Sequence, residues 1–404
     1  MIRGNNFTFF RKESDRKKYV LLACCALSLD IIIRFIVIFL TKLPFGSLLS
    51  SLFAPALFIV LILLNINSDA FKNIRQTDWL LILVFYLYSI FSFVVNVAAR
   101  SYILKYWNYI VLIAPLFYLF GITFPTDYKM KKAWLVLAKI IIFVDIAYVV
   151  YALVGSKGIQ EDAMERAYRM APGIMLMVFE FFETRKIKDF LCAAICSIYL
   201  LTCGTRGPVL VLSVYWLYCL MFVGNTKWWR KALSSIIIAG VVLLYFSPLF
   251  YSIISSLADT SAKFGLSTRV FEEIMQGTFI SNDNGRSVIY QEAYELIKQN
   301  PFGYGIYGEW SAIGWNVHNF YLQFILHFGV ILGPILLVLF ISCVVRALIN
   351  NNNKYAKNFI IIFACFVFVK GFAGGSYIDW ECAFLLGLSI KEIRNKKLLY
   401  SKVI

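Results

Sequence analysis

The sequence has little of what metal sites and the common soluble catalytic motifs require. Only 15% of its 404 residues are charged, and only two are histidines. It contains no phosphate-binding P-loop, no Gly-x-Ser-x-Gly nucleophile motif and no Asp-x-Asp pair. The nine cysteines have no metal-ligand spacing, and most fall inside apolar segments, where cysteine behaves as a small hydrophobe. We therefore expect no metal, no cofactor and no disulfide framework.

What the chain has in abundance is apolar sequence. Hydrophobic residues make up 60% of it and the mean hydropathy is +0.74, values that a soluble protein of this length would not reach. The pattern predicts an all-α polytopic membrane protein with about twelve transmembrane helices of roughly 20 residues or less. The predicted spans are residues 19–41, 47–66, 79–98, 103–123, 134–154, 169–183, 189–203, 208–223, 232–255, 319–342, 358–372 and 377–390.

The net charge of +16 is distributed in a way that argues against a nucleic-acid partner. Lysine and arginine cluster in short loops between apolar runs, and every second loop is basic, as the positive-inside tendency requires. Both termini are then cytoplasmic. This topology divides the chain into spans one to nine (1–255), a long external loop with an amphipathic helix (256–318), and spans ten to twelve with a cytoplasmic tail (319–404).

Several arginines fall on the outer side, where the same tendency makes them least expected. They are Arg166, Arg169, Arg206, Arg269 and Arg286. One explanation is that they bind an anion. The other is that their side chains extend to lipid phosphates at the interface. The sequence alone leaves both open.

Arg206 and Arg286 each stand at a structural boundary. Arg206 belongs to the turn Cys203–Pro208, which joins spans seven and eight, and Pro208 suits the first turn of the following helix. Arg286 opens an amphipathic helix for which Asp283 or Asn284 can provide the cap. A cation has the wrong sign for that helix end, so an anion brought there would explain it. The apolar residues that predict packing of this helix on the membrane domain are Val288, Ile289, Ala293, Leu296 and Ile297.

His318 precedes span ten at the outer boundary of the membrane, where its ordinary pKa of about 6.5 suits a general base. Taken alone, such a histidine is more often an interfacial hydrogen-bonding group. His327 lies further along the same helix and is expected to be a packed core residue. Three acids, Glu309, Asp379 and Glu381, are near enough in the topology to orient a base or bind a sugar hydroxyl. Asp145 and Lys139 are expected to be buried in the bundle without an evident partner.

Three motifs occur in a recognisable order on the outer side: the Thr-Arg-Gly turn, the Gly-Arg-led helix followed by NPFGYG, and HNFYLQFILHFG. This order resembles the bacterial O-antigen polymerase and O-antigen ligase superfamily. The resemblance implies a GT-C-like, metal-independent glycosyltransferase. Its donor would be a glycan on undecaprenyl diphosphate at the outer face of the cytoplasmic membrane.

By this resemblance, Arg206 and Arg286 match the arginines that hold the donor diphosphate, and His318 matches the catalytic histidine. Further candidates for substrate contact are Arg166, Arg169, Glu309, Asn319 and Tyr321. HNFYLQFILHFG reads as closer to the polymerases, which join lipid-linked repeat units and work with a flippase and a chain-length regulator. A ligase acting on lipid A core or protein shares all three motifs. A polysaccharide flippase is the alternative of another class, although the inverted repeats typical of transporters are not evident.

Overall fold

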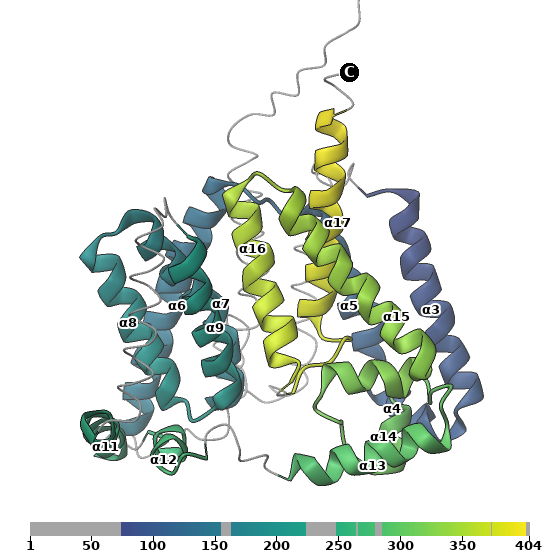
Figure 1. Ribbon diagram of the computed structural model, residues 1–404, viewed down its shortest axis with the longest axis horizontal. Helices are drawn as coiled ribbons and strands as arrows, with labels where there is room; N and C mark the ends of the chain where they lie inside the picture. The colour runs from purple at the N-terminus through teal and green to yellow at the C-terminus, as the bar shows by residue number, and fades with distance from the viewer. Residues whose placement is uncertain are drawn as a thin grey trace, which may run out of the picture.

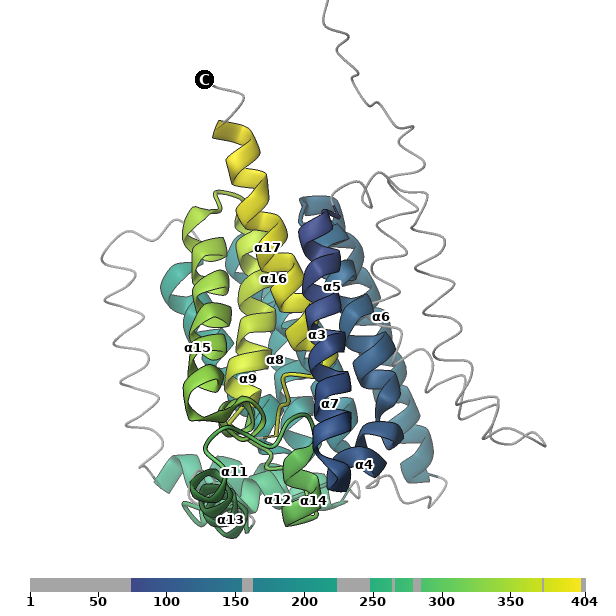
Figure 2. The same ribbon diagram turned by 90° about the vertical axis from the view of Figure 1, so that its right-hand side faces the viewer.

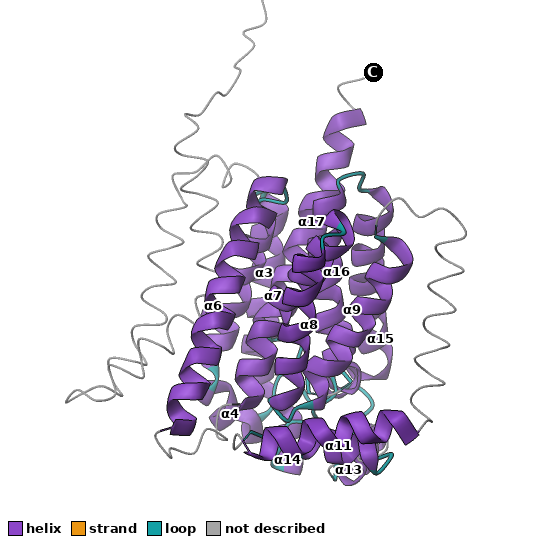
Figure 3. Ribbon diagram, turned by 90° about the vertical axis from the view of Figure 1, so that its left-hand side faces the viewer, coloured by secondary structure: helices purple, strands orange, loops and turns teal. Residues whose placement is uncertain are grey.

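The structure is a computed structural model, and it describes residues 74–154, 163–223, 248–263, 266–278, 285–372 and 374–400. The described residues form helices and connecting turns, and they include no strand, as predicted (Figure 3). The predicted spans at 19–41 and 47–66 and most of the span at 232–255 lie outside these residues. So do Asp283 and Asn284, the predicted cap of the amphipathic helix.

The bundle is built from helices that match the remaining predicted spans in order. Its first half consists of α3 (Gln76–Val95), α4 (Arg100–Lys105), α5 (Ala114–Thr123), α6 (Tyr128–Val154), α7 (Ala163–Thr184), α8 (Ile187–Thr202) and α9 (Arg206–Phe222). Its second half consists of α15 (Phe320–Asn350), α16 (Lys354–Ala364), the π-helical turn η5 (Cys365–Val369) and α17 (Trp380–Tyr400). Between these halves lie α11 (Pro248–Lys263), α12 (Arg269–Met275), α13 (Arg286–Gln299) and α14 (Gly308–Ile313).

Within the described residues, two helices are long and apolar enough to cross a membrane, namely α3 and α15. A third candidate is a broken pair, Val97–Lys105 and Tyr109–Thr123, whose parts meet at 69°. The apolar outer face of α3, where Leu80 and Leu87 are more than half exposed, suits a lipid environment. The chain is thus a helical membrane protein, while the count of twelve spans and the GT-C-like fold remain predictions.

The predicted span at 103–123 is not one straight helix. Pro115 has no N–H to donate to the carbonyl of Val111, and the Tyr86 hydroxyl donates to that carbonyl instead, at 2.8 Å. The residues around it form η3 (Tyr109–Ile113), a π-helical turn. The 69° bend itself lies before this turn, between Lys105 and Tyr109. The apolar run predicted one continuous span here, because hydrophobicity alone does not record the break between Lys105 and Tyr109.

The centre of the bundle is a close crossing of α5 and α17 (Figure 2). A Cβ atom added at Gly121 would lie 2.3 Å from the carbonyl oxygen of Phe384, and one added at Gly387 would lie 2.1 Å from that of Tyr118. Two glycines therefore let the backbones meet, as small residues do at helix interfaces in membranes. Packed around this crossing is a core of buried aromatic rings, including Phe124, Phe359 and Phe363.

Helix α15 is interrupted at Gly329, whose φ of 82° and ψ of 172° are not helical. The NPFGYG segment lies against the break and supplies the missing backbone partners. The N–H of Tyr304 donates to the Leu326 carbonyl at 2.7 Å, that of Gly305 donates to the His327 carbonyl at 3.1 Å, and that of Val330 donates to the Pro301 carbonyl at 2.9 Å. The segment that follows α13 is therefore fixed to the middle of α15, and the predicted span at 319–342 is bent.

Helices α11 to α14 lie across one end of the bundle, and the end of α17 lies at the other (Figures 1 and 3). The turn before α9 and the segment before α15 meet the bundle at the α11–α14 end. The opposite end carries lysines and arginines in ion pairs with acids. Lys131 pairs with Glu180 and Glu183, Lys354 pairs with Glu183, and Arg394 pairs with the buried Asp78 at 2.7 Å.

Candidate functional site

Arg286 is the first residue of α13, as predicted, and the residue before it provides the turn. Gly285 has φ of 79°, in the left-handed region that glycine adopts without strain. No acidic residue follows in the first helical turn. The N–H groups at the start of α13 and the guanidinium therefore both favour an anion at this point.

His318 lies in the turn between α14 and α15 in a conformation that few side chains adopt. Its φ is 53°, one of three positive values at non-glycine residues in the described part of the chain. Its backbone N–H donates to Oδ1 of Asn316 at 3.0 Å, and the adjacent Asn319 caps α15. Strain of this kind persists only where the surroundings impose it, and it is concentrated at functional sites.

The pKa of His318 is lowered from 6.5 because the ring is partly buried and because Arg286 places a positive charge near it. Both causes disfavour the charged imidazolium. At neutral pH the ring is therefore uncharged and able to accept a proton. Arg286 and His318, which are 32 residues apart in sequence, therefore lie within electrostatic range of each other.

Arg206 is the first residue of α9, and its charge is shared with an acid from α12. Its Nε lies 3.1 Å from Oε2 of Glu273, while the other oxygen of that carboxylate lies 3.1 Å from Nε of Arg269. The Glu273 side chain is only 7% exposed. Two of the predicted outward arginines therefore converge on one buried carboxylate, which no sequence motif marked as a candidate.

Tyr168, on α7, connects these parts and was also missed. Its hydroxyl lies against Gly207, where an added Cβ atom would be 1.9 Å from the Tyr168 oxygen. The charges of Lys370 and Arg286 both act on this hydroxyl, and the Lys370 ammonium lies 5.1 Å from the centre of the tyrosine ring. A phenol beside the Thr-Arg-Gly turn thus faces the two cations contributed by α13 and by the end of η5. In the sequence, the one indication of a role for Tyr168 was that it directly precedes Arg169, a predicted site residue.

Lys370 itself is held by the acids at the start of α17. Its Nζ lies 3.5 Å from Oδ2 of Asp379 and 3.0 Å from Oε1 of Glu381. Asp379 and Glu381 were predicted as residues that could orient a base, and in the structure both pair with this lysine. The loop that contains them also approaches the histidine, since a Cβ atom at Gly374 would lie 3.9 Å from Nδ1 of His318.

Glu309 contacts the other histidine. Its side chain is completely buried and joins Nε2 of His327 through Oε2 and the Gln323 amide through Oε1, the latter at 3.2 Å. On its far side, His327 Nδ1 lies 2.5 Å from the hydroxyl of Tyr377. His327 is buried as predicted, but it belongs to a polar network and not to apolar packing. That network ties α14, α15 and the segment before α17 together around the turn that carries His318.

Two further candidates have contacts that shape this turn. Asn319 accepts hydrogen bonds from the N–H groups of Tyr321 and Leu322 at 3.0 and 3.1 Å, so its side chain caps α15. The Tyr321 hydroxyl donates to the Phe368 carbonyl at 2.9 Å, and its ring packs on Phe372 at 4.4 Å between centres. Both residues therefore hold the start of α15 in place beside His318.

Arg166 and Arg169 are half-buried on α7, on either side of Tyr168 in sequence. The charge of Arg166 acts on Asp145, whose Oδ2 accepts a hydrogen bond from the Tyr199 hydroxyl at 2.6 Å. Asp145 therefore has partners that its sequence position did not reveal. Lys139 is 41% exposed and lies 4.0 Å from Asp189, so it is not a buried residue.

Comparison with known protein families covers the part of the chain that contains Arg206, Arg286 and His318. The family model described as O-Antigen ligase matches residues 191–337. The match includes Arg206, Arg286 and His318 and ends before Lys370 and the acids of α17. No curated protein and no solved structure matches the chain. The family match supports the relationship that the three motifs predicted, because residues 191–337 are similar to the O-antigen ligase family.

Proposed function

We propose that the protein is a polysaccharide polymerase. In this proposal it transfers a growing glycan from undecaprenyl diphosphate to a lipid-linked repeat unit. The observation that carries the proposal is that the charge of Arg286 acts on both His318 and the Tyr168 hydroxyl, while that hydroxyl lies against the turn of Arg206. A candidate base and two arginines at helix starts, from separate parts of the chain, are thus brought into one region of the fold.

The reaction follows from these groups. The acceptor hydroxyl attacks the anomeric carbon of the donor with inversion, and the bond between that carbon and the diphosphate oxygen breaks. The electron pair of that bond leaves with undecaprenyl diphosphate, and the acceptor proton passes to His318. Arg286 and the N-terminal N–H groups of α13 stabilise the charge that grows on the leaving oxygen, a task that a metal ion performs in other transferases.

Arg206 would bind the donor diphosphate only after exchanging its ion pair with Glu273 for the phosphate. Its pairing with Glu273 fixes it at the start of α9 and balances its charge while no donor is bound. A diphosphate entering between Arg206 and Arg286 competes with Glu273 for the guanidinium, and Tyr168 is positioned to donate a hydrogen bond to the same phosphate oxygens. Arg166 and Arg169, which flank Tyr168, would contact the sugar or phosphate at the edge of this space.

We further propose that the protein lies in the bacterial cytoplasmic membrane with both termini inside and the site facing outward. Support comes from the basic end of the bundle opposite α11–α14, which carries Lys131, Lys354 and Arg394 (Figure 1). Membrane lipids, a flippase that delivers the donor and a chain-length regulator would be its partners.

The family match gives a second candidate, an O-antigen ligase that moves the finished glycan to lipid A core or protein. It favours a glycosyltransferase-like enzyme over a flippase. The two enzymes differ in their acceptor and not in the donor site, so the residues named above serve either reaction.

The deciding experiment supplies purified, reconstituted protein with lipid-linked repeat units alone. A polymerase makes a ladder of products that differ by one repeat. If no product forms until lipid A core is added, the polymerase assignment is wrong and the ligase is correct. The same assay with EDTA tests the metal-independent mechanism, because full inhibition that magnesium reverses would contradict it.

A further inference from the structure

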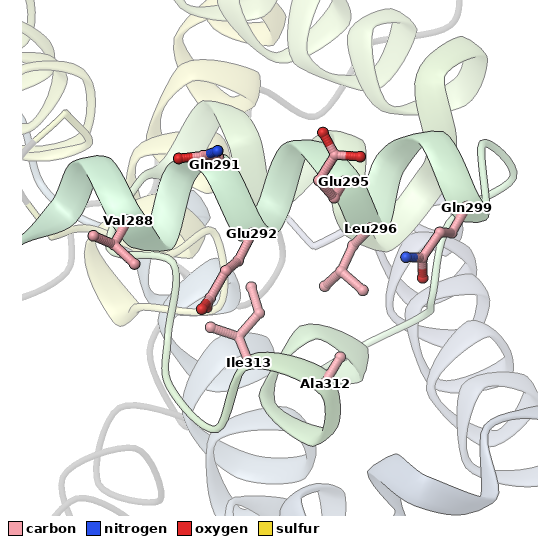
Figure 4. Close-up of a pocket in the computed structure, with 8 residues that line it drawn as sticks. All are labelled: Val288, Gln291, Glu292, Glu295, Leu296, Gln299, Ala312 and Ile313. Atoms are coloured by element: carbon pink, nitrogen blue, oxygen red, sulfur yellow. The ribbon is translucent and has the colours of Figure 1, made fainter.

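A groove of about 560 Å³ lies between α13 and α14, outside the cluster of Arg206, Arg286 and His318. Figure 4 shows the side chains of Glu292, Leu296 and Gln299 directed from α13 toward α14, where Ala312 and Ile313 form the opposite wall. The apolar pattern of α13 predicted that Val288 packs on the membrane domain. In the structure Val288 is 59% exposed and lines this groove, so that assignment is wrong for this residue.

The groove has the chemistry of a saccharide site and not of a phosphate site. Its polar lining consists of two carboxylates, Glu292 and Glu295, and two amides, Gln291 and Gln299, with no lysine or arginine. Carboxylates accept hydrogen bonds from hydroxyl groups, and amides both donate and accept them. The aliphatic side chains between them provide a surface for the C–H face of a sugar ring, as in other small-molecule sites.

The carboxylate of Glu292 is available for such a ligand. Glu295 is paired with Lys298 at 2.8 Å, whereas Glu292 forms no ion pair with any residue that the structure describes. The groove therefore contains a carboxylate without a charged partner beside an apolar wall, an arrangement that repels a diphosphate and suits a neutral molecule rich in hydroxyl groups.

Both walls of the groove lead to the candidate site. Helix α13 begins at Arg286 and its lining residues run from Val288 to Gln299, a length of about 17 Å at about 1.5 Å per residue. Helix α14 ends at Ile313, five residues before His318. A glycan attached to a diphosphate at Arg286 would extend along α13 into the groove.

We propose that the groove between α13 and α14 binds the glycan, with the sugar units near the reacting end lying along Glu292 and Gln299. The inference rests on the proposed function, because it places the sugar part of that substrate. It assigns a role to the outer helices: they bind carbohydrate, while the helix starts at Arg206 and Arg286 bind phosphate.

The test uses the full-length protein in detergent and a probe that lacks both lipid and diphosphate. The probe is a set of oligosaccharides released by partial acid hydrolysis from the surface polysaccharide of the bacterium that encodes the protein. Ala312→Trp fills the groove, and Glu292→Ala removes its free carboxylate. Ser311→Trp is the matched control, because Ser311 precedes Ala312 on α14 but does not line the groove.

We expect wild-type protein and Ser311→Trp to bind the probe equally. Glu292→Ala should weaken binding by about tenfold, the effect of losing one hydrogen bond to a charged group. Ala312→Trp should abolish binding. In the polymerase assay both groove variants should raise KM for lipid-linked repeat units and leave kcat nearly unchanged.

Two results would overturn the inference: no binding of the probe to the wild-type protein, or equal binding by wild type and Ala312→Trp. Unaltered melting temperatures of the variants exclude a folding defect as the cause of lost binding. The binding assay needs no turnover, so its outcome is distinct from that of the proposed function. If the protein binds the probe through the groove but makes no polymer, the groove is confirmed as a glycan site and the polymerase assignment is wrong.

Discussion

The two histidines of this chain lie nine residues apart in environments of opposite character. His318 lies in a turn, at a positive φ, beside the cation of Arg286. His327 lies inside α15, completely buried, against the carboxylate of Glu309 and the hydroxyl of Tyr377. A nearby cation keeps an imidazole uncharged and reactive, whereas a buried carboxylate fixes it in place. On the proposed function, the turn carries the proton-transfer group, and the buried network of α15 holds that turn in place.

The largest effect expected from this contrast follows removal of the His318 ring. His318→Ala should reduce transfer by about 10²–10⁴-fold, the usual contribution of a general base, and should leave the melting temperature unchanged. The measurement is product formation by purified protein, with thermal unfolding in the same detergent. Wild-type polymer from this variant would remove His318 from the mechanism.

Arg286→Ala should cost about 10²–10³-fold in kcat, since it removes a donor aimed at the developing charge. Arg286→Lys should restore only part of the activity, because an ammonium lacks the two-pronged geometry of a guanidinium. Lys298→Ala, in the last turn of the same helix, is the control and should have little effect. Equal activity of Arg286→Ala and Lys298→Ala would contradict the phosphate-binding role.

Breaking the buried pair should act on stability first. Glu309→Ala or His327→Ala leaves one polar group buried without its partner, at a cost of about 3–5 kcal/mol. Because each variant removes the same contact, the double variant should cost less than the sum of the two. Thermal unfolding of the three variants measures this coupling. Additive losses would show that Glu309 and His327 stabilise the protein independently.

The smallest expected effect is a shift in pH dependence. The pKa of His318 is lowered from 6.5, so its base form persists below that pH and kcat/KM should decline only at more acidic values. Arg286→Gln removes one cause of the lowering, so the pKa should rise and the decline should move to higher pH. The pH profile of the residual activity measures this. An unmoved acidic limb would show that the two charges do not interact.

The sequence predicted the helices well and their irregularities poorly. Long apolar runs located α3, α6 and α15, because burial in lipid requires about 20 apolar residues. The bend between Lys105 and Tyr109 and the break at Gly329 were missed. The break depends on the NPFGYG segment, which supplies hydrogen bonds from elsewhere in the chain.

The residues of the candidate site also fall into those that the sequence could predict and those that it could not. The place of Arg286 at its helix start could be predicted, because a cation there has the wrong sign for the helix dipole. The role of His318 stays a prediction. Glu273, Tyr168 and the pairing of Glu309 with His327 could not be predicted. Each owes its place to a contact between helices that are far apart in sequence, and no local pattern records such contacts.

One measurement tests the central claim most directly. Reconstituted wild-type protein, His318→Ala and His327→Gln are each given labelled lipid-linked repeat units, and release of undecaprenyl diphosphate is followed together with polymer. The account predicts release and polymer from the wild type, neither from a folded His318→Ala, and activity in whatever fraction of His327→Gln remains folded. Release and polymer from His318→Ala at the wild-type rate would contradict it.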